Sequence, residues 1–122
     1  MTTVDPAHLV GAGAAVGAIL RYATNGYLDG ITGDRRFPYG TFTVNVVGSF
    51  VLAVVTVSGA GTDVVHLVGT GACGSYTTFS SFSVDTVRIW ENGDRLLAAW
   101  YAAVNFLGAL LGIGLAFGIT TL

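Results

Sequence analysis

Charged side chains are scarce in this chain, and lysine is missing altogether. Only 10% of the 122 residues are charged, and the five cations, all arginine, leave a formal net charge of -2. Ordinary soluble domains carry about 25% charged residues, and a domain this small needs polar residues to cover its surface. The scarcity of charge excludes a cytosolic enzyme and a disordered segment, and the lack of a basic cluster excludes a nucleic-acid binder.

The chain also lacks the marks of a secreted, disulfide-bonded protein. Its single cysteine, Cys73, rules out an intramolecular disulfide framework and a multi-cysteine metal site. No signal peptide is evident, because Asp5 and no cation precede the first apolar run. We therefore expect that run to remain in the mature protein.

Apolar residues make up 52% of the chain, and its mean hydropathy is +0.70. A helix that crosses about 30 Å of hydrocarbon needs about 20 mainly apolar residues. Windows of that length lie between polar loops, of which DGITGDRRFPYG at 29–40 is the longest. We predict an all-α, multi-pass protein of the cell membrane, surrounded by lipid, with one domain over residues 1–122. Its four transmembrane helices are expected at about 7–28, 40–59, 64–90 and 96–120.

The third of these segments is anomalous, because its middle is a cluster of glycine, serine and threonine. Such residues weaken a helix, and non-helical backbone is tolerated at membrane depth only where protein or a polar cavity surrounds it. We predict two half-helices with a break near 71–78. The alternative is a continuous helix whose small residues only allow close packing.

Glycines also recur at four-residue spacing in the first and fourth segments, a pattern that lets helix backbones approach closely in lipid. It predicts a tight helical bundle and says nothing about chemistry. The pairs are Gly13 and Gly17, Gly108 and Gly112, and Gly114 and Gly118.

Polar side chains form stripes on two of the predicted helices. Thr41 and Asn45 share one face of the second helix, and Tyr101 and Asn105 share one face of the fourth. Each stripe alone is explained by hydrogen bonding between helices. Together with the residues after the break, they indicate a common polar path.

Aromatic and hydroxyl side chains alternate directly after the predicted break. Phe79 and Phe82 lie three positions apart, with Ser80 and Ser81 between them. Hydroxyls and amides donate hydrogen bonds, and the edges of aromatic rings are electropositive. A path lined by such groups suits a small anion that accepts strong hydrogen bonds.

Charged residues inside the predicted helices need a reason, because a buried arginine is unfavourable unless it is paired, hydrated or able to reach the interface. Arg21 lies late in the first helix, where it either extends to the interface or draws anions into an aqueous vestibule. Asp85 and Arg88 are spaced to pair locally, and we interpret that pair as structural.

Three blocks of sequence resemble the Fluc (CrcB-like) fluoride channels, and the resemblance covers essentially the whole chain. They are GAGAAVGAILRY at 11–22, GTFTVNVVGSF at 40–50 and GTGACGSYTTFSSFS at 69–83. The resemblance implies an antiparallel dimer of four-helix subunits with two pores, through which fluoride leaves the cytoplasm passively.

Site residues follow from the resemblance position by position. Phe79 and Phe82 resemble the pore phenylalanines, Asn45 the pore asparagine and Arg21 the vestibule arginine. The family often has serine on the polar track of the fourth helix, so Asn105 and the apolar Ala109 are departures. The expected track comprises Thr41, Ser80, Ser81, Tyr101 and Asn105.

The resemblance also implies a structural sodium ion at the dimer centre, held by the backbone carbonyls of Gly74 and Thr77 from both subunits. A broken helix leaves carbonyl oxygens without partners in a low-dielectric region, and a hard cation prefers oxygen ligands. Such an ion would bind without being transported. From the residues alone, trapped water is an equal alternative.

Two other classes remain to be weighed. A proton-coupled exporter of the small multidrug resistance type has similar length but needs a glutamate within its first helix, whereas the only glutamate here is Glu91, in a loop. A membrane subunit that only packs against a partner would need the glycine pairs but not the polar stripes. An enzyme is not expected, because His8 and His66 lack metal-ligand spacing and the serines lack His and Asp partners on a shared face.

Apart from Arg21, the arginines lie in two predicted loops and their flanks, on one side of a four-span protein. The opposite loops have no lysine or arginine, so the positive-inside rule predicts that both termini lie outside. An antiparallel homodimer needs both orientations. We therefore hypothesise that this chain inserts mainly one way and pairs with a similar subunit of the opposite bias. The alternative is a second copy of the chain in a dual-topology homodimer. The biased residues are Arg35, Arg36, Arg88 and Arg95.

Overall fold

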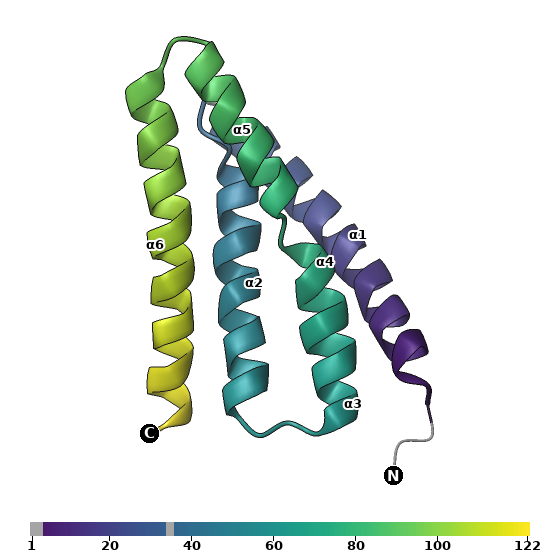
Figure 1. The fold of residues 1–122 in the computed structure, drawn as a ribbon. Coiled ribbons are helices and arrows are strands. Elements are labelled where there is room, and N and C mark those ends of the chain that lie inside the picture. The colour runs from purple at the N-terminus through teal and green to yellow at the C-terminus, as the bar shows by residue number, and fades with distance from the viewer. Residues whose placement is uncertain (1–3, 34–35) are drawn as a thin grey trace.

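The computed structural model describes residues 4–33 and 36–122, and every regular element within them is a helix. The predicted all-α class is thereby confirmed for the described residues. Figure 1 shows the N-terminal end, the C-terminal end and the α2–α3 turn at one end of the bundle, and the α5–α6 turn at the other. The elements are α1 (Pro6–Thr32), α2 (Tyr39–Val57), α3 (Thr62–Val64), the π-helix η1 (Val65–Cys73), α4 (Gly74–Tyr76), α5 (Phe79–Glu91) and α6 (Arg95–Thr120).

Local side chains set the ends of the two longest helices. The Asp5 carboxylate accepts a hydrogen bond from the Ala7 amide at 2.9 Å and caps α1, as an N-cap aspartate should. Gly33 ends α1 in the left-handed conformation, with φ 65°, which glycine adopts without strain. Asp94 caps α6 by accepting from the Leu97 amide at 3.3 Å.

The third membrane segment is interrupted, as predicted, but the break is shorter than expected. Only Thr77 and Thr78 leave the helical conformation, with ψ 159° and ψ 112°. The stretch 71–76, which we expected to belong to the break, is helical. The Thr78 hydroxyl accepts a hydrogen bond from the Ser81 amide at 3.1 Å and thereby starts α5. The ribbon steps sideways at this point in Figure 1.

Helix α1 packs on η1 through its glycines. A Cβ atom at Gly13 would lie 1.9 Å from the Leu67 carbonyl oxygen, and one at Gly17 would lie 2.2 Å from that of Ala72. These distances leave no room for any side chain. The two backbones therefore touch directly, which is how helices associate where apolar side chains gain little by meeting.

Helix α6 uses one of its two glycine pairs against α2. A Cβ atom at Gly108 would lie 2.9 Å from the Val46 side chain, and one at Gly112 would lie 3.2 Å from the Val46 carbonyl oxygen. In contrast, Gly114 and Gly118 meet nothing within 4 Å among the described residues. The close packing expected from the glycine spacing thus holds within the subunit for the first pair on α6 only.

The outer surface of the bundle is apolar. Large side chains such as Leu96 (83% exposed) and Leu111 (74% exposed) project from α6, where a protein in water would present polar groups. Among the described residues, α2 and α6 are long and apolar enough to cross a membrane. Arg35, one of the cations in the predicted charge bias, lies outside the described residues.

The α1–η1 contact predicts that Gly13→Ala destabilises the protein. The added methyl group collides with backbone, and overpacking of this kind costs roughly 1–3 kcal/mol. Gly11→Ala is the matched control, because that position on the same helix has nothing within 4 Å in the described chain. We expect the purified Gly13→Ala protein to melt at a lower temperature in detergent and Gly11→Ala to match the wild type. Equal melting of the two variants would contradict the contact.

Candidate functional site

The carboxamide of Asn45, on α2, holds the break between α4 and α5. Its Oδ1 accepts a hydrogen bond from the Thr78 amide at 2.8 Å, and its Nδ2 donates to the Thr78 carbonyl at 3.3 Å. Backbone groups at a break lose their intrahelical partners, and each unmet group is costly away from water. One side chain supplies both partners, so Thr78 can be buried, with 6% of its surface exposed.

Asn105, on α6, joins the same junction. Asn45 Nδ2 also donates to Asn105 Oδ1 at 3.3 Å, and Asn105 Nδ2 donates to the Tyr101 carbonyl at 3.0 Å. Both Asn105 and Tyr101 are buried. Because the Asn105 nitrogen is bonded to its own helix, its oxygen is fixed toward Asn45. The polar stripes of α2 and α6 therefore meet at the break in the third segment.

A second cluster of hydrogen bonds surrounds Asp85, on α5. Its Oδ2 accepts from the Thr41 hydroxyl at 3.0 Å and from the Tyr101 hydroxyl at 3.2 Å. Its Oδ1 accepts from Arg88 Nη2 at 2.5 Å, which is the local ion pair predicted from the spacing. Asp85 is 8% exposed, and this full set of partners is what a buried carboxylate requires.

Aromatic rings pack beside both clusters. The Phe82 ring stacks on Tyr101 with centroids 5.8 Å apart and an angle of 29° between the planes. Phe79 lies 5.8 Å from Phe82, centroid to centroid. Phe79 itself is 78% exposed, so the two phenylalanines differ: Phe82 is half-buried against Tyr101, and Phe79 projects from the subunit.

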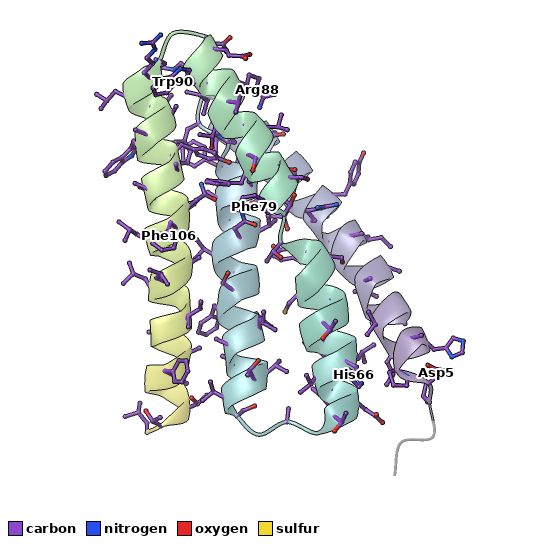
Figure 2. The ribbon with its side chains drawn as sticks, viewed as in Figure 1. Asp5, His66, Phe79, Arg88, Trp90 and Phe106 are labelled. Carbon is purple, nitrogen blue, oxygen red and sulfur yellow. The ribbon has the colours of Figure 1, made fainter. Side chains whose placement is uncertain are left out.

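A cleft of about 330 Å³ opens at the junction of α2, the break and α6. Asn45 and Asn105 line it together with Phe79, Phe82 and Phe106. Figure 2 labels Phe79 at the start of α5 and Phe106 on α6. The cleft thus combines amide groups with aromatic rings, in an otherwise apolar wall.

A second, larger cavity of about 520 Å³ lies nearer the α5–α6 turn. It is polar, and its lining includes Asp29 from α1, Thr41 from α2, and Asp85 and Arg88 from α5. Thr41 lies one helical turn before Asn45. The cluster around Asp85 lines this cavity, and Tyr101 links it to the cleft through its stack on Phe82 and the hydrogen bond that its carbonyl accepts from Asn105.

Four predicted pathway residues do not line either cavity in the described part of the chain. Tyr101 is fully buried beside them. Arg21 is partly exposed on α1. Ser80 is exposed, with its hydroxyl 3.4 Å from that of Thr78, and Ser81 contributes its backbone amide to the same hydroxyl. Their assignment to the path remains a prediction.

The break frees the two carbonyls that the resemblance assigns to a cation. In a continuous α-helix the Thr78 amide would donate to the Gly74 carbonyl and the Ser81 amide to the Thr77 carbonyl. Here those amides donate to Asn45 and to the Thr78 hydroxyl instead. Oxygen atoms released in this way fit the preference of a hard cation. Among the described residues no group of three or more His, Cys, Asp or Glu could hold a metal ion.

Sequence reasoning missed the role of two residues. Asp85 was interpreted only as the local partner of Arg88, although its spacing of three from Phe82 places it on the same helix face. Thr78 was missed because its bonds to Asn45 come from its backbone amide and carbonyl, for which the side-chain pattern gives no signal; a threonine before a helix could have indicated only its role as the N-cap of α5.

Comparison with known proteins identifies relatives across nearly the full chain. Residues 8–119 match the family described as CrcB-like protein, Camphor Resistance (CrcB). Fluoride-specific ion channel FluC 2 of Haloarcula marismortui is 56% identical over 119 residues, which cover 98% of this chain and 97% of the relative. Fluoride-specific ion channel FluC 1 of Halobacterium salinarum is 49% identical over 111 residues, which cover 91% and 90%.

The helical fold, the broken segment and these relatives define the class as a membrane-embedded transport protein, and not an enzyme. The chain belongs to the CrcB-like family, as the resemblance of its sequence blocks indicated.

The junction predicts that Asn45→Asp destabilises the fold. The new carboxylate has no proton to donate, so the Thr78 carbonyl and Asn105 Oδ1 would each face another acceptor, at a cost of about 1–3 kcal/mol. Asn92→Asp is the control, because Asn92 is exposed and its side chain makes no hydrogen bond to the described residues. Thermal unfolding should separate the two variants. A melting temperature for Asn45→Asp equal to that of the control would rule out the clamp.

Proposed function

We propose that this chain is a fluoride-specific ion channel that lowers cytoplasmic fluoride by passive export across the cell membrane. The observation that carries the proposal is the junction of Asn45, Thr78 and Asn105, which opens into the cleft beside Phe82. The names of the relatives, which describe fluoride-specific ion channels at up to 56% identity, support the same ion.

The chemistry of the junction favours fluoride over larger anions. Amide and hydroxyl protons and the electropositive ring edges of phenylalanine are suited to stabilise a small anion, and hydrogen bonds strengthen in a low-dielectric interior. Chloride is larger and accepts weaker hydrogen bonds. A narrow path built for the smaller ion therefore does not compensate chloride for its lost hydration.

Passive movement is favoured over proton coupling. The multidrug-type exporter needs a glutamate inside its first helix, whereas Glu91 lies at the end of α5 and is exposed. Asp85 is paired with Arg88 and accepts two further hydrogen bonds, so it is not a free proton carrier. We therefore do not propose drug and proton exchange.

A second subunit is part of the proposal, because the cleft in one chain is open on one side. Phe79 (78% exposed) and Phe106 (64% exposed) form its uncovered wall. A partner in antiparallel orientation would cover that wall and complete one path on each subunit. The partner is either a second copy of this chain or a paired relative, and lipid surrounds the rest of the multi-pass assembly.

A structural sodium ion is proposed where the two breaks would meet at the dimer centre. The carbonyls of Gly74 and Thr77 from both subunits would hold it, since the amides that normally bond them are directed elsewhere. When bound, the ion would supply positive charge to carbonyl oxygens whose usual amide donors bond elsewhere among the described residues. It stabilises the assembly and is not transported.

We expect liposomes that contain only this chain to release fluoride and to retain chloride. Detergent imposes no membrane orientation, so a single kind of chain can supply both subunits before reconstitution. The measurement is electrode-monitored efflux of each halide, with and without a proton gradient. Comparable fluoride and chloride efflux would refute selectivity, and dependence on the proton gradient would refute passive transport.

Variants of the phenylalanines that line the cleft test their role in the same assay. Phe79→Ile and Phe82→Ile keep most of the apolar volume but remove the ring edge, so each should reduce fluoride efflux while the dimer persists. Phe117→Ile, on the exposed surface of α6, is the matched substitution away from the cleft and should leave efflux unchanged.

Orientation in the membrane can be tested with cysteines at the two ends of the bundle. Asp63, in α3, and Glu91, at the end of α5, are both exposed. In a Cys73→Ala background, the positive-inside rule predicts that an impermeant thiol reagent labels Asp63→Cys on intact cells but labels Glu91→Cys only after permeabilisation. That result would support pairing with an oppositely biased relative. Equal labelling of both sites would instead establish a dual-topology homodimer.

A further inference from the structure

Asp85 creates an electrostatic problem for an anion path. Its carboxylate is buried and connects to the cleft through Tyr101, which stacks on Phe82 and bonds to Asn105. A negative charge at that position repels any anion nearby, and the repulsion grows as the surroundings become less polar. The hydroxyl protons of Thr41 and Tyr101 point toward Asp85 and only partly offset its charge.

Arg88 is placed to offset the remaining negative charge of Asp85. Its guanidinium bonds to Asp85 Oδ1, while its side chain is 61% exposed and that of Asp85 is 12% exposed. The arginine therefore reaches the carboxylate from the solvent-exposed side, where the guanidinium remains hydrated. Figure 2 places Arg88 on α5, toward the end that carries the α5–α6 turn.

Arg88 offsets the negative charge of the carboxylates that line the polar cavity. Its lining includes two carboxylates, Asp29 and Asp85, and among the described residues that line it Arg88 is the one cation. Without Arg88 the described lining of the cavity would carry two carboxylates and no cation beside the cluster around Asp85. An anion would then meet a barrier at this end of the path.

We propose that Arg88 is a positioning residue that sets anion permeability by neutralising Asp85, so that a buried carboxylate can organise Thr41 and Tyr101 without repelling the ion. The inference rests on the proposed fluoride-channel function and adds a role for the ion pair beyond the stability of α5. If the pair were only structural, the charge of residue 88 would affect folding, and permeation would follow the amount of folded protein.

The test is fluoride efflux from liposomes, normalised to folded dimer measured by size-exclusion chromatography. Arg88→Gln should lower efflux roughly tenfold or more, because the carboxylate is then uncompensated in a low-dielectric region. Arg88→Lys keeps the charge and should retain most of the efflux. Arg95→Gln removes a cation at the same end of the bundle, where Arg95 lies over the Trp90 ring at 5.0 Å, and should match the wild type.

The double variant Asp85→Asn/Arg88→Gln decides between the two roles. Removal of both charges should restore efflux to within about threefold of the wild type, the non-additive result expected of a coupled pair. A folded double variant that remains as inactive as Arg88→Gln would overturn the proposal, as would normal efflux in Arg88→Gln. The double variant is informative even if Arg88→Gln alone does not fold.

The wild-type protein separates this inference from the function on which it rests. If the wild type releases no fluoride, the proposed function fails, and the role of Arg88 in permeation fails with it. If the wild type conducts and Arg88→Gln conducts equally, the function stands and the role of Arg88 fails.

Discussion

Backbone groups at membrane depth must find partners inside the protein, and the carboxamide of Asn45 meets that demand where the third segment breaks. It accepts from the amide and donates to the carbonyl of Thr78. Because α2 supplies this clamp, the break has a fixed position rather than a range of them. The start of α5, the position of Phe82 and the contact with Asn105 on α6 all follow from it.

The buried carboxylate of Asp85 also finds its partners inside the protein. The structure places the one buried carboxylate of the described residues, Asp85, where two hydroxyls and a guanidinium meet it. These partners come from α2, α5 and α6, so a single acidic group joins three helices. Glycine contacts between α1 and η1 and between α6 and α2 bring the backbones close enough for such short polar side chains to reach each other.

Hydropathy and glycine content were sufficient to predict the helices and the existence of a break, because both depend on local composition. The length of the break was not predictable, since it depends on a hydrogen bond from the Thr78 amide to Asn45 Oδ1, and Asn45 is distant in sequence. Spacing places Asn45 and Asn105 in polar stripes on two different helices. Only the fold shows that these two stripes meet. Asp85 was taken for half of a local pair because its bonds to Thr41 and Tyr101 are tertiary. The pore roles of Phe79 and Phe82 were predicted from the resemblance to the family, because the spacing of the two residues does not indicate a pore.

The geometry of the Asn45 amide also affects how long an ion would stay at the junction of the proposed channel. Its nitrogen divides two protons between the Thr78 carbonyl and Asn105 Oδ1, each 3.3 Å away, just beyond the usual range of about 2.7–3.2 Å. Bonds this long release little energy when formed and require little to exchange. In the proposed channel, an ion at the junction would accept a hydrogen bond from one of these N–H groups while the other still holds the Thr78 carbonyl.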